Sequence, residues 1–204
     1  MINVNQLYEI QNKLEQAQNV AIFTHVNPDG DALGSSFALQ AALTEMGKNA
    51  TVLLEKPVPE KFDYLYGTYS LSAEPLEFDT AIALDCGSAG RLGSLAPIYD
   101  AIGTRLCVDH HYTDSPFGDV YYAEPTSAAC AELVYLLVKN MCGTLPASTL
   151  ASLYTGISTD TGQFKFSNVT PRTMRIAAEL LELGLDHRDI TRSNNHYLGW
   201  LCYG

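Results

Sequence analysis

The sequence predicts an α/β domain in which a mostly parallel sheet is flanked by helices. Short apolar runs of strand length alternate along the chain with segments whose apolar residues recur at helical spacing. The strand-like runs are nearly continuous in apolar residues, which is typical of strands that helices cover on both faces. The 204 residues are enough to bury a substantial core, and neither an internal repeat nor a low-complexity segment interrupts them.

The first half of the chain contains two predicted helices and two predicted strands. Leu7, Ile10 and Leu14 recur at helical spacing and indicate that the first segment is an amphipathic helix. Asp31 lies near the start of the second helix, and Gly47 marks its end. The predicted elements are a helix over 4–18, a strand over 19–26, a helix over 31–47 and a strand over 50–55.

The second half of the chain contains two further predicted strands and three predicted helices. Pro171 suits the first turn of the last helix, and Gly184 follows its end. Residues 56–78 are rich in Pro, Tyr, Glu and Gly and predict no clear element. The predicted elements are strands over 80–86 and 105–111 and helices over 127–141, 147–158 and 171–184.

The charge and the hydropathy pattern limit the classes of function. The net charge of −11 argues against a broad nucleic-acid-binding surface, although it leaves a nucleotide substrate open. No run reaches about 18 consecutive apolar residues, so we expect no membrane-spanning helix. The N-terminus lacks a basic segment followed by an apolar one, so we expect no signal peptide.

The cysteines favour a reducing compartment. They are odd in number and none belongs to a CxxC pair, so we expect neither a disulfide framework nor a thiolate zinc site. The sequence therefore predicts a cytoplasmic protein. The five cysteines are Cys86, Cys107, Cys130, Cys142 and Cys202.

Acidic and imidazole side chains follow three of the predicted strands, and a further aspartate follows a predicted helix. Because the carboxyl ends of parallel strands share one edge of a sheet, we expect these side chains to meet in one crevice there. The residues are His25, Asp29, Asp31, Asp85, Asp109, His110, His111 and Asp160.

The mixture of carboxylates and imidazoles predicts a metal site. Such ligands suit Mn²⁺, Mg²⁺, Co²⁺ or Fe²⁺ better than a structural zinc ion, and they are too many for one ion and about right for two. Two neighbouring ions can clamp a phosphate and activate a water. Taken singly, each aspartate could be a helix cap or a turn residue, and one of the histidines could be a core residue. Four such explanations would have to hold together, which favours the metal site.

Four segments of this chain resemble the motifs of a known family. "THVNPDGDALGS", "ALDCGSAGRLG", "VDHH" and "GISTDTGQFKFSNVT" are similar in order, spacing and flanking residues to the four motifs of the DHH phosphoesterase superfamily. The similarity is greatest to its bacterial subfamily of oligoribonucleases and phosphoadenosine-phosphate phosphatases, and it runs from about residue 15 to residue 190. The resemblance implies a Rossmann-like DHH domain.

The resemblance also implies roles for the site residues. Asp109 would orient an imidazole. His111 would face the substrate phosphate as a charge stabiliser or proton donor. Apart from the resemblance, Arg91 follows Asp85 closely in the sequence, and it would either contact the substrate or pair with an acid. The implied ligands are His25, Asp29 and Asp85 for one Mn²⁺ ion, and Asp31, Asp85, His110 and Asp160 for the other.

The implied activity is metal-assisted hydrolysis of a phosphate ester with two Mn²⁺ ions as cofactors, or Mg²⁺ or Co²⁺ in their place. The expected substrates are short oligonucleotides, cyclic-dinucleotide products or 3′-phosphoadenosine 5′-phosphate. An inorganic pyrophosphatase or exopolyphosphatase is the enzymatic alternative, although the flank "TGQFKFSNVT" favours nucleotide substrates. The expected partner is a short oligonucleotide or nucleotide phosphate and not a membrane, and a homodimer is left open.

The resemblance implies a second domain that this sequence does not contain. Residues 1–190 are expected to form the catalytic domain, and residues 191–204 the truncated start of an interdomain linker. A natural single-domain member is the alternative. A metal-binding remnant or interaction module without turnover is another, with Tyr197, Trp200 and Tyr203 as a partner contact.

Overall fold

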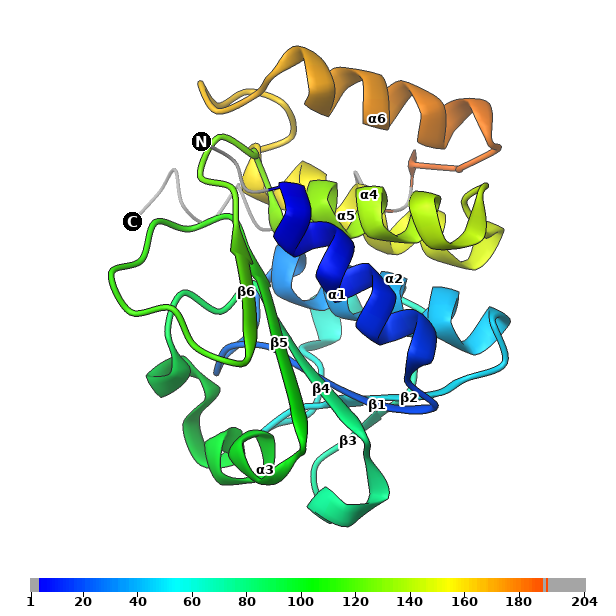
Figure 1. Ribbon diagram of the computed structural model, residues 1–204. Helices are drawn as coiled ribbons and strands as arrows, with labels where there is room; N and C mark the ends of the chain where they lie inside the picture. Colours follow the sequence, from blue (N-terminus) through cyan, green and yellow to red (C-terminus); the bar gives the residue numbers. More distant parts are fainter. Residues whose placement is uncertain (1–3, 189, 191–204) are drawn as a thin grey trace.

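The computed structural model describes residues 4–188 and residue 190, and it contains one six-stranded parallel sheet with helices on both faces (Figure 1). The strand order is β3-β2-β1-β4-β5-β6, so the chain starts in the middle of the sheet and builds outward in both directions. The predicted fold class is therefore confirmed. The strands are β1 (Asn19–Phe23), β2 (Asn49–Leu53), β3 (Tyr69–Ser70), β4 (Thr80–Leu84), β5 (Thr104–Asp109) and β6 (Val120–Ala123).

The three central strands end level with one another. Phe23 at the end of β1 pairs with Ala83 of β4, and Leu84 pairs with Val108 of β5. The residues that follow these strands therefore emerge side by side at one edge of the sheet.

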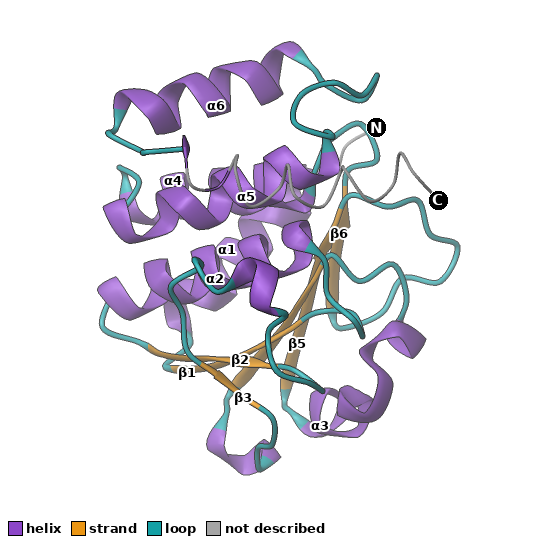
Figure 2. Ribbon diagram, turned by 180° about the vertical axis from the view of Figure 1, so that it is seen from behind, coloured by secondary structure: helices purple, strands orange, loops and turns teal. Residues whose placement is uncertain are grey.

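The helices are distributed unequally over the two faces. Helices α1, α2, α4 and α5 cover one face, and α6 lies outside α4 and α5, whereas α3 lies on the other face (Figures 1 and 2). The larger core lies on the first face, and a smaller core around Tyr99 lies on the second. The helices are α1 (Val4–Gln16), α2 (Gly30–Glu45), α3 (Ala96–Ala101), α4 (Cys130–Cys142), α5 (Leu150–Asp160) and α6 (Pro171–Glu182).

Alternating side chains of the central strands supply the two cores. In β1, Ile22 faces the larger core, whereas Phe23 packs edge-on against Tyr99 in the smaller one, with ring centroids 5.4 Å apart. Because both faces are covered, the strands have no polar face, as the apolar runs in the sequence predicted.

Two glycines allow α2 and α5 to approach closely. A Cβ atom on Gly34 would lie 2.4 Å from the Ser152 carbonyl oxygen, and one on Gly156 would lie 2.7 Å from Asp31 Oδ1. No larger residue fits at these positions without displacement of a helix. The close packing sets Asp31 of α2 against α5.

The predicted strands and helices are present, with differences at their ends. The first strand stops at Phe23, because the chain turns into the connection that leads to α2. The helix predicted over 127–141 starts only at Cys130, and the helix predicted over 147–158 begins as a 3₁₀ turn before α5. The sequence predicted neither α3 nor β6. These elements are six and four residues long, too short for a clear periodic pattern.

Residues 56–78, which predicted no element, contain strand β3 between two 3₁₀ turns, Glu60–Phe62 and Pro75–Glu77. Within the described part of the chain, the helices are too short or too polar to span a membrane. The predicted linker over 191–204, with Tyr197, Trp200 and Tyr203, lies outside the described residues.

Candidate metal centre

The polar residues that follow the strands converge at one edge of the sheet. They form three overlapping groups, within each of which one ligand atom per residue lies within 4.8 Å of the others. The residues are His25 and Asp29 in the β1–α2 connection, Asp31 in the first turn of α2, Asp85 after β4, Asp109 at the end of β5, His110 and His111 after it, and Asp160 at the end of α5. The groups are His25, Asp29 and Asp85; Asp31, His110 and Asp160; and Asp85, Asp109, His110 and His111.

The first group is arranged around the imidazole of His25. Its Nε2 lies 3.9 Å from Asp29 Oδ2 and 3.7 Å from Asp85 Oδ2. The other ring nitrogen, Nδ1, donates a hydrogen bond to the Val26 carbonyl at 2.8 Å. This hydrogen bond fixes the ring so that Nε2 faces the two carboxylates, as is usual for a histidine that binds a metal.

Asp29 uses its two carboxylate oxygens differently. Oδ1 caps α2 by accepting hydrogen bonds from the amides of Asp31 and Ala32, each at 3.0 Å. Oδ2 faces His25. Asp29 is therefore both a helix cap and a member of the cluster, because each role uses a different oxygen.

The second group is arranged around the imidazole of His110. Its Nε2 lies 3.2 Å from Asp160 Oδ2, 3.5 Å from Asp85 Oδ1 and 3.7 Å from Asp31 Oδ2. Its Nδ1 lies 3.3 Å from the Ser127 carbonyl, which leaves Nε2 as the nitrogen that faces the carboxylates.

Asp85 lies between these two groups. Oδ2 faces His25, whereas Oδ1 faces His110. The residue is buried and has a φ angle of 55°, in the left-handed region that side chains other than glycine rarely adopt. Such strain is typical of functional sites.

Two buried polar atoms at the contact between Asp85 and His110 have no hydrogen-bond partner among the described residues. They are Asp85 Oδ1 and His110 Nε2, which face each other across 3.5 Å. A buried polar atom without a partner is costly, and a bound ion is one of the few arrangements that would satisfy both. The chemistry of the cluster, carboxylate oxygen with imidazole nitrogen, fits a divalent cation.

Asp31 is fully buried and also contacts a third helix. Its Oδ2 accepts a hydrogen bond from the Cys130 amide at 2.6 Å, and its Oδ1 accepts one from the Ala131 amide at 2.9 Å. Helix α4 has no cap from its own N-cap residue, Ala129. A side chain of α2 thus supplies the acceptors that the N-terminus of α4 lacks.

The protein without a cation carries an electrostatic cost at this site. Burial, together with the nearby carboxylates of Asp85 and Asp160, raises the pKa of Asp31 well above its ordinary value, and burial also raises the pKa of Asp160. Burial opposes the protonation of His110, but the carboxylates of Asp160 and Asp85 outweigh it and raise the pKa of His110 to about 11. The cluster therefore holds a proton where a cation would otherwise balance its charge.

Asp109 organises the two histidines that follow it. Its Oδ1 accepts hydrogen bonds from the backbone amides of His110 and His111, at 2.7 and 3.0 Å, and lies 2.8 Å from His111 Nδ1. The hydrogen bond to Asp109 raises the pKa of His111 above its ordinary value. The side chain of His111 is 44% exposed, so this imidazole is both oriented from inside and open to solvent.

Arg91 and Asp109 both lie against Gly87, which places Arg91 close to the cluster. A Cβ atom added to Gly87 would lie 4.0 Å from Arg91 Nη1 and 3.7 Å from Asp109 Oδ2. Among the described residues, Arg91 forms no ion pair with a carboxylate. The backbone of Arg91 is held in place because its carbonyl accepts a hydrogen bond from the Val26 amide at 2.8 Å.

Behind His110 lies a network of polar side chains, most of them buried, that the sequence patterns do not predict. Glu132 of α4 is fully buried and accepts a hydrogen bond from Arg172 Nε at 2.8 Å. Arg172 also contacts Ser127 Oγ at 2.8 Å and Glu124 Oε1 at 2.7 Å. Ser127 contacts His110 through its carbonyl, so α6 supports the loop behind that imidazole. A charged residue in an apolar helix was the only sequence signal for Glu132.

Known proteins are similar to this chain in sequence and in fold. A profile described as the DHH family, N-terminal domain, matches residues 19–157. The bifunctional oligoribonuclease and PAP phosphatase NrnA of Thermus thermophilus is 37% identical over 84% of this chain and 52% of its own length. The protein of the same name from Bacillus subtilis is 26% identical over 80% of this chain and 52% of its own.

A solved structure is also similar. An exopolyphosphatase-related protein from Bacteroides fragilis superposes with a TM-score of 0.86 and 26% identity, over 95% of this chain and 61% of that one. The chain thus spans only about half the length of the curated relatives named above. The profile matches more than half of this chain and includes both histidine-containing motifs, and the chain therefore belongs to the DHH family.

Proposed function

We propose that this chain is the metal-binding catalytic domain, over residues 1–190, of a phosphoesterase with a centre of two Mn²⁺ ions. Its substrates are short oligonucleotides, cyclic-dinucleotide products or 3′-phosphoadenosine 5′-phosphate, and it acts on their phosphodiester or phosphomonoester bonds. The observation that carries the proposal is the position of Asp85, whose two oxygens face two separate imidazole-centred groups. The DHH family and the names of the NrnA relatives support the choice of reaction and substrate.

The ligand sets follow from the same contacts. His25, Asp29 and Asp85 would hold one ion, and Asp85 would share the other with three further residues: Asp31, His110 and Asp160. Mg²⁺ or Co²⁺ suits these ligands as well. When bound, such ions lower the pKa of a water and stabilise negative charge on the phosphoryl oxygens. The partnerless atoms of Asp85 and His110 support this assignment.

His111 acts on the substrate from beside the metal centre. Asp109 holds its Nδ1, which leaves Nε2 directed away from that carboxylate. The hydrogen bond to Asp109 raises the pKa of His111 and so favours its protonated form, in which Nε2–H can donate a hydrogen bond to a phosphoryl oxygen or a proton to the leaving oxygen. Arg91 has no carboxylate partner in the described part of the chain and supplies a second cationic contact to the phosphate.

The compartment proposed for this reaction is the cytoplasm. The four described cysteines (Cys86, Cys107, Cys130 and Cys142) are free, as a reducing compartment would keep them.

Two assays test the proposed function directly. One measures the release of mononucleotide from a 5′-phosphorylated dinucleotide in the presence of Mn²⁺, and the other measures phosphate release from 3′-phosphoadenosine 5′-phosphate. Activity in either assay that disappears in the D85N variant supports the proposal. The Bacteroides relative is named after exopolyphosphatase, so pyrophosphate and polyphosphate are assayed in parallel. Turnover of those two alone would replace the proposed substrates. Manganese binding without any turnover would support the metal-binding remnant.

A further inference from the structure

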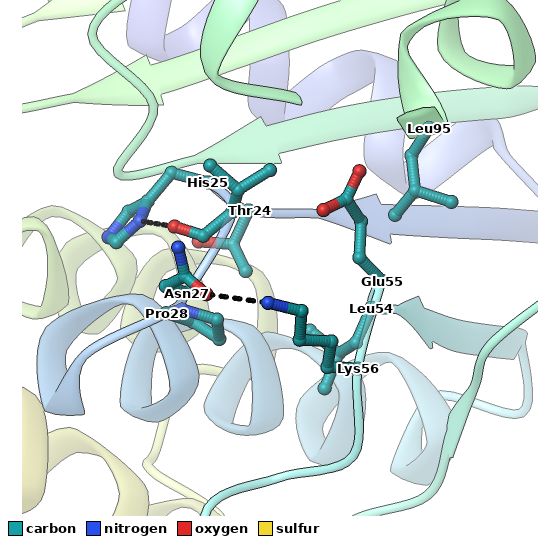
Figure 3. Close-up of a pocket in the computed structure, with 9 residues that line it drawn as sticks. Thr24, His25, Asn27, Pro28, Leu54, Glu55, Lys56 and Leu95 are labelled. Carbon is teal, nitrogen blue, oxygen red and sulfur yellow. Dashed lines mark hydrogen bonds between the residues drawn. The ribbon is translucent and has the colours of Figure 1, made fainter. Parts of the chain in front are cut away.

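A hollow in the surface, shown in Figure 3, shares His25 with the candidate metal centre. It is formed where β1 and β2, which are neighbours in the sheet, reach their carboxyl ends. His25 lines this hollow and also belongs to the first metal-ligand group, so the hollow adjoins that group. The lining residues are Thr24, His25, Val26, Asn27, Pro28, Leu54, Glu55, Lys56 and Leu95.

The hollow contains a cationic side chain held by an amide. Lys56 Nζ donates a hydrogen bond to Asn27 Oδ1 at 3.3 Å, and Figure 3 shows the two side chains meeting at the hollow. Asn27 has a φ angle of 53°, which asparagine tolerates better than most residues. Among the described residues, Lys56 forms no ion pair with a carboxylate.

The hollow also contains a hydroxyl group without a partner. Thr24 is 3% exposed, and its Oγ1 has no hydrogen-bond partner among the described residues. Buried hydroxyl groups nearly always have a partner, and one without a partner calls for an explanation such as a bound ligand. Thr24 follows β1 directly, next to His25.

The one acidic residue among the lining residues, Glu55, contacts Ser94, which does not line the hollow. The carboxylate of Glu55 accepts a hydrogen bond from the Ser94 amide. The Ser94 side chain and amide, together with attraction to Lys56, lower the pKa of Glu55. In Figure 3 the carboxylate points away from the pair formed by Lys56 and Asn27. Beside this carboxylate, the hollow offers three groups that can donate hydrogen bonds, an ammonium, a hydroxyl and an amide, which together suit an anion with several oxygens.

We infer that this hollow binds a second phosphate group of the nucleotide substrate, one that the enzyme does not hydrolyse. This inference rests on the proposed function, because the phosphate that reacts would lie at the adjacent metal centre. A lysine ammonium is a compact charge on a flexible stem and commonly binds phosphate. The Thr24 hydroxyl would donate a further hydrogen bond. The site would thus favour substrates that carry a terminal phosphate besides the one under attack.

The test compares two dinucleotides, a 5′-phosphorylated diadenylate and the same molecule without the 5′-phosphate. The Michaelis constants of both are measured for the Mn²⁺-loaded wild-type chain, for K56Q and T24V, and for K61Q as a control. Lys61 carries the same charge five residues away but does not line the hollow. The melting temperature of each variant checks its fold. T24V removes a hydroxyl that has no partner, so we expect it to fold as the wild type does.

The wild type is expected to prefer the phosphorylated dinucleotide, and K56Q and T24V are expected to reduce that preference about tenfold while K61Q retains it. The inference is overturned if the wild type shows no preference, if K56Q and T24V keep it, or if K61Q loses it equally. If the chain hydrolyses neither dinucleotide, the proposed function fails in this respect. In that case the dissociation constants of the two dinucleotides are measured by calorimetry on the same variants. The ratio of the two dissociation constants then replaces the ratio of the Michaelis constants as the test of the inference.

Discussion

Asp31 Oδ2 accepts a hydrogen bond from the backbone amide of Cys130 at 2.6 Å, so that a carboxylate of α2 completes the N-terminus of α4. The same oxygen lies 3.7 Å from His110 Nε2. One buried side chain thus joins the packing of two helices to the candidate metal centre, and folding of this region positions the ligand.

Two substitutions of Asp31 separate these roles. Asn keeps the volume and one acceptor oxygen and removes the buried charge, whereas Ala leaves the amides of Cys130 and Ala131 without their acceptor. We expect the free energy of unfolding of metal-free D31A to lie about 1–3 kcal/mol below that of D31N. Urea unfolding in the presence of a chelator measures it. Equal stability of the two variants would contradict the capping role.

The two ligand groups predict that single substitutions remove ions selectively. D29N keeps the cap on α2, because asparagine caps as well as aspartate, and it removes a charged oxygen from the group of His25. D160N likewise removes a charged oxygen from the group of His110. We expect each variant to lose one of two bound Mn²⁺ ions, measured by elemental analysis after gel filtration. A variant that loses neither ion would show that its aspartate is not a ligand.

Asp109 predicts a shift in the titration of His111. In D109N the neutral amide no longer stabilises the protonated imidazole, so the pKa of His111 should fall toward its ordinary value of 6.5. NMR titration of the metal-free chain measures this pKa. The activity of the Mn²⁺-loaded variant should fall about tenfold or more, because the imidazole loses its orienting partner. An unchanged pKa would mean that Asp109 does not set the charge of His111.

Asp79, far from the metal centre, predicts a dependence of stability on pH. Partial burial opposes its charge, but hydrogen bonds from the amides of Asn19 and Gln18 outweigh this and lower its pKa below 3.8. A carboxylate with a lowered pKa in the folded state stabilises the fold above its ordinary pKa, and this contribution is lost as the pH falls through the lowered value.

We therefore expect D79N to be less stable than the wild type near neutral pH, by less than about 1 kcal/mol because the carboxylate is exposed. The difference should shrink as the pH falls below the ordinary pKa of 3.8 and disappear below the lowered pKa. Urea unfolding from neutral pH through this acidic range compares the two proteins. A difference that grows on acidification would contradict the sign of this contribution.

Much of the fold follows from local patterns in the sequence. The apolar runs of β1, β4 and β5 predict buried parallel strands, and that arrangement alone predicts that the residues after them converge. Strand β6 is different, because its four residues contain two tyrosines and alternate in burial. Its place at the sheet edge depends on pairing with β5, which no local pattern specifies.

The sequence predicts which residues gather at the candidate site, but it does not predict the contacts between them. The strand ends indicate which carboxylates meet, but the division of Asp29 between a helix cap and His25 depends on three-dimensional geometry. The support that Arg172 gives to Ser127 and Glu132 joins residues that are 40 or more positions apart, so only tertiary packing creates it. The hollow beside His25 likewise combines two strand ends that sequence spacing cannot align.

The central claim is that Asp85 joins two ions in one centre, and the Mn²⁺ content and spin coupling of D85N test it most directly. Asparagine preserves the volume but removes the charged oxygens that face His25 and His110. We expect the wild type to bind two Mn²⁺ ions with the electron paramagnetic resonance signal of a coupled pair, and D85N to bind neither ion tightly. Two tightly bound, coupled ions in D85N would contradict the account.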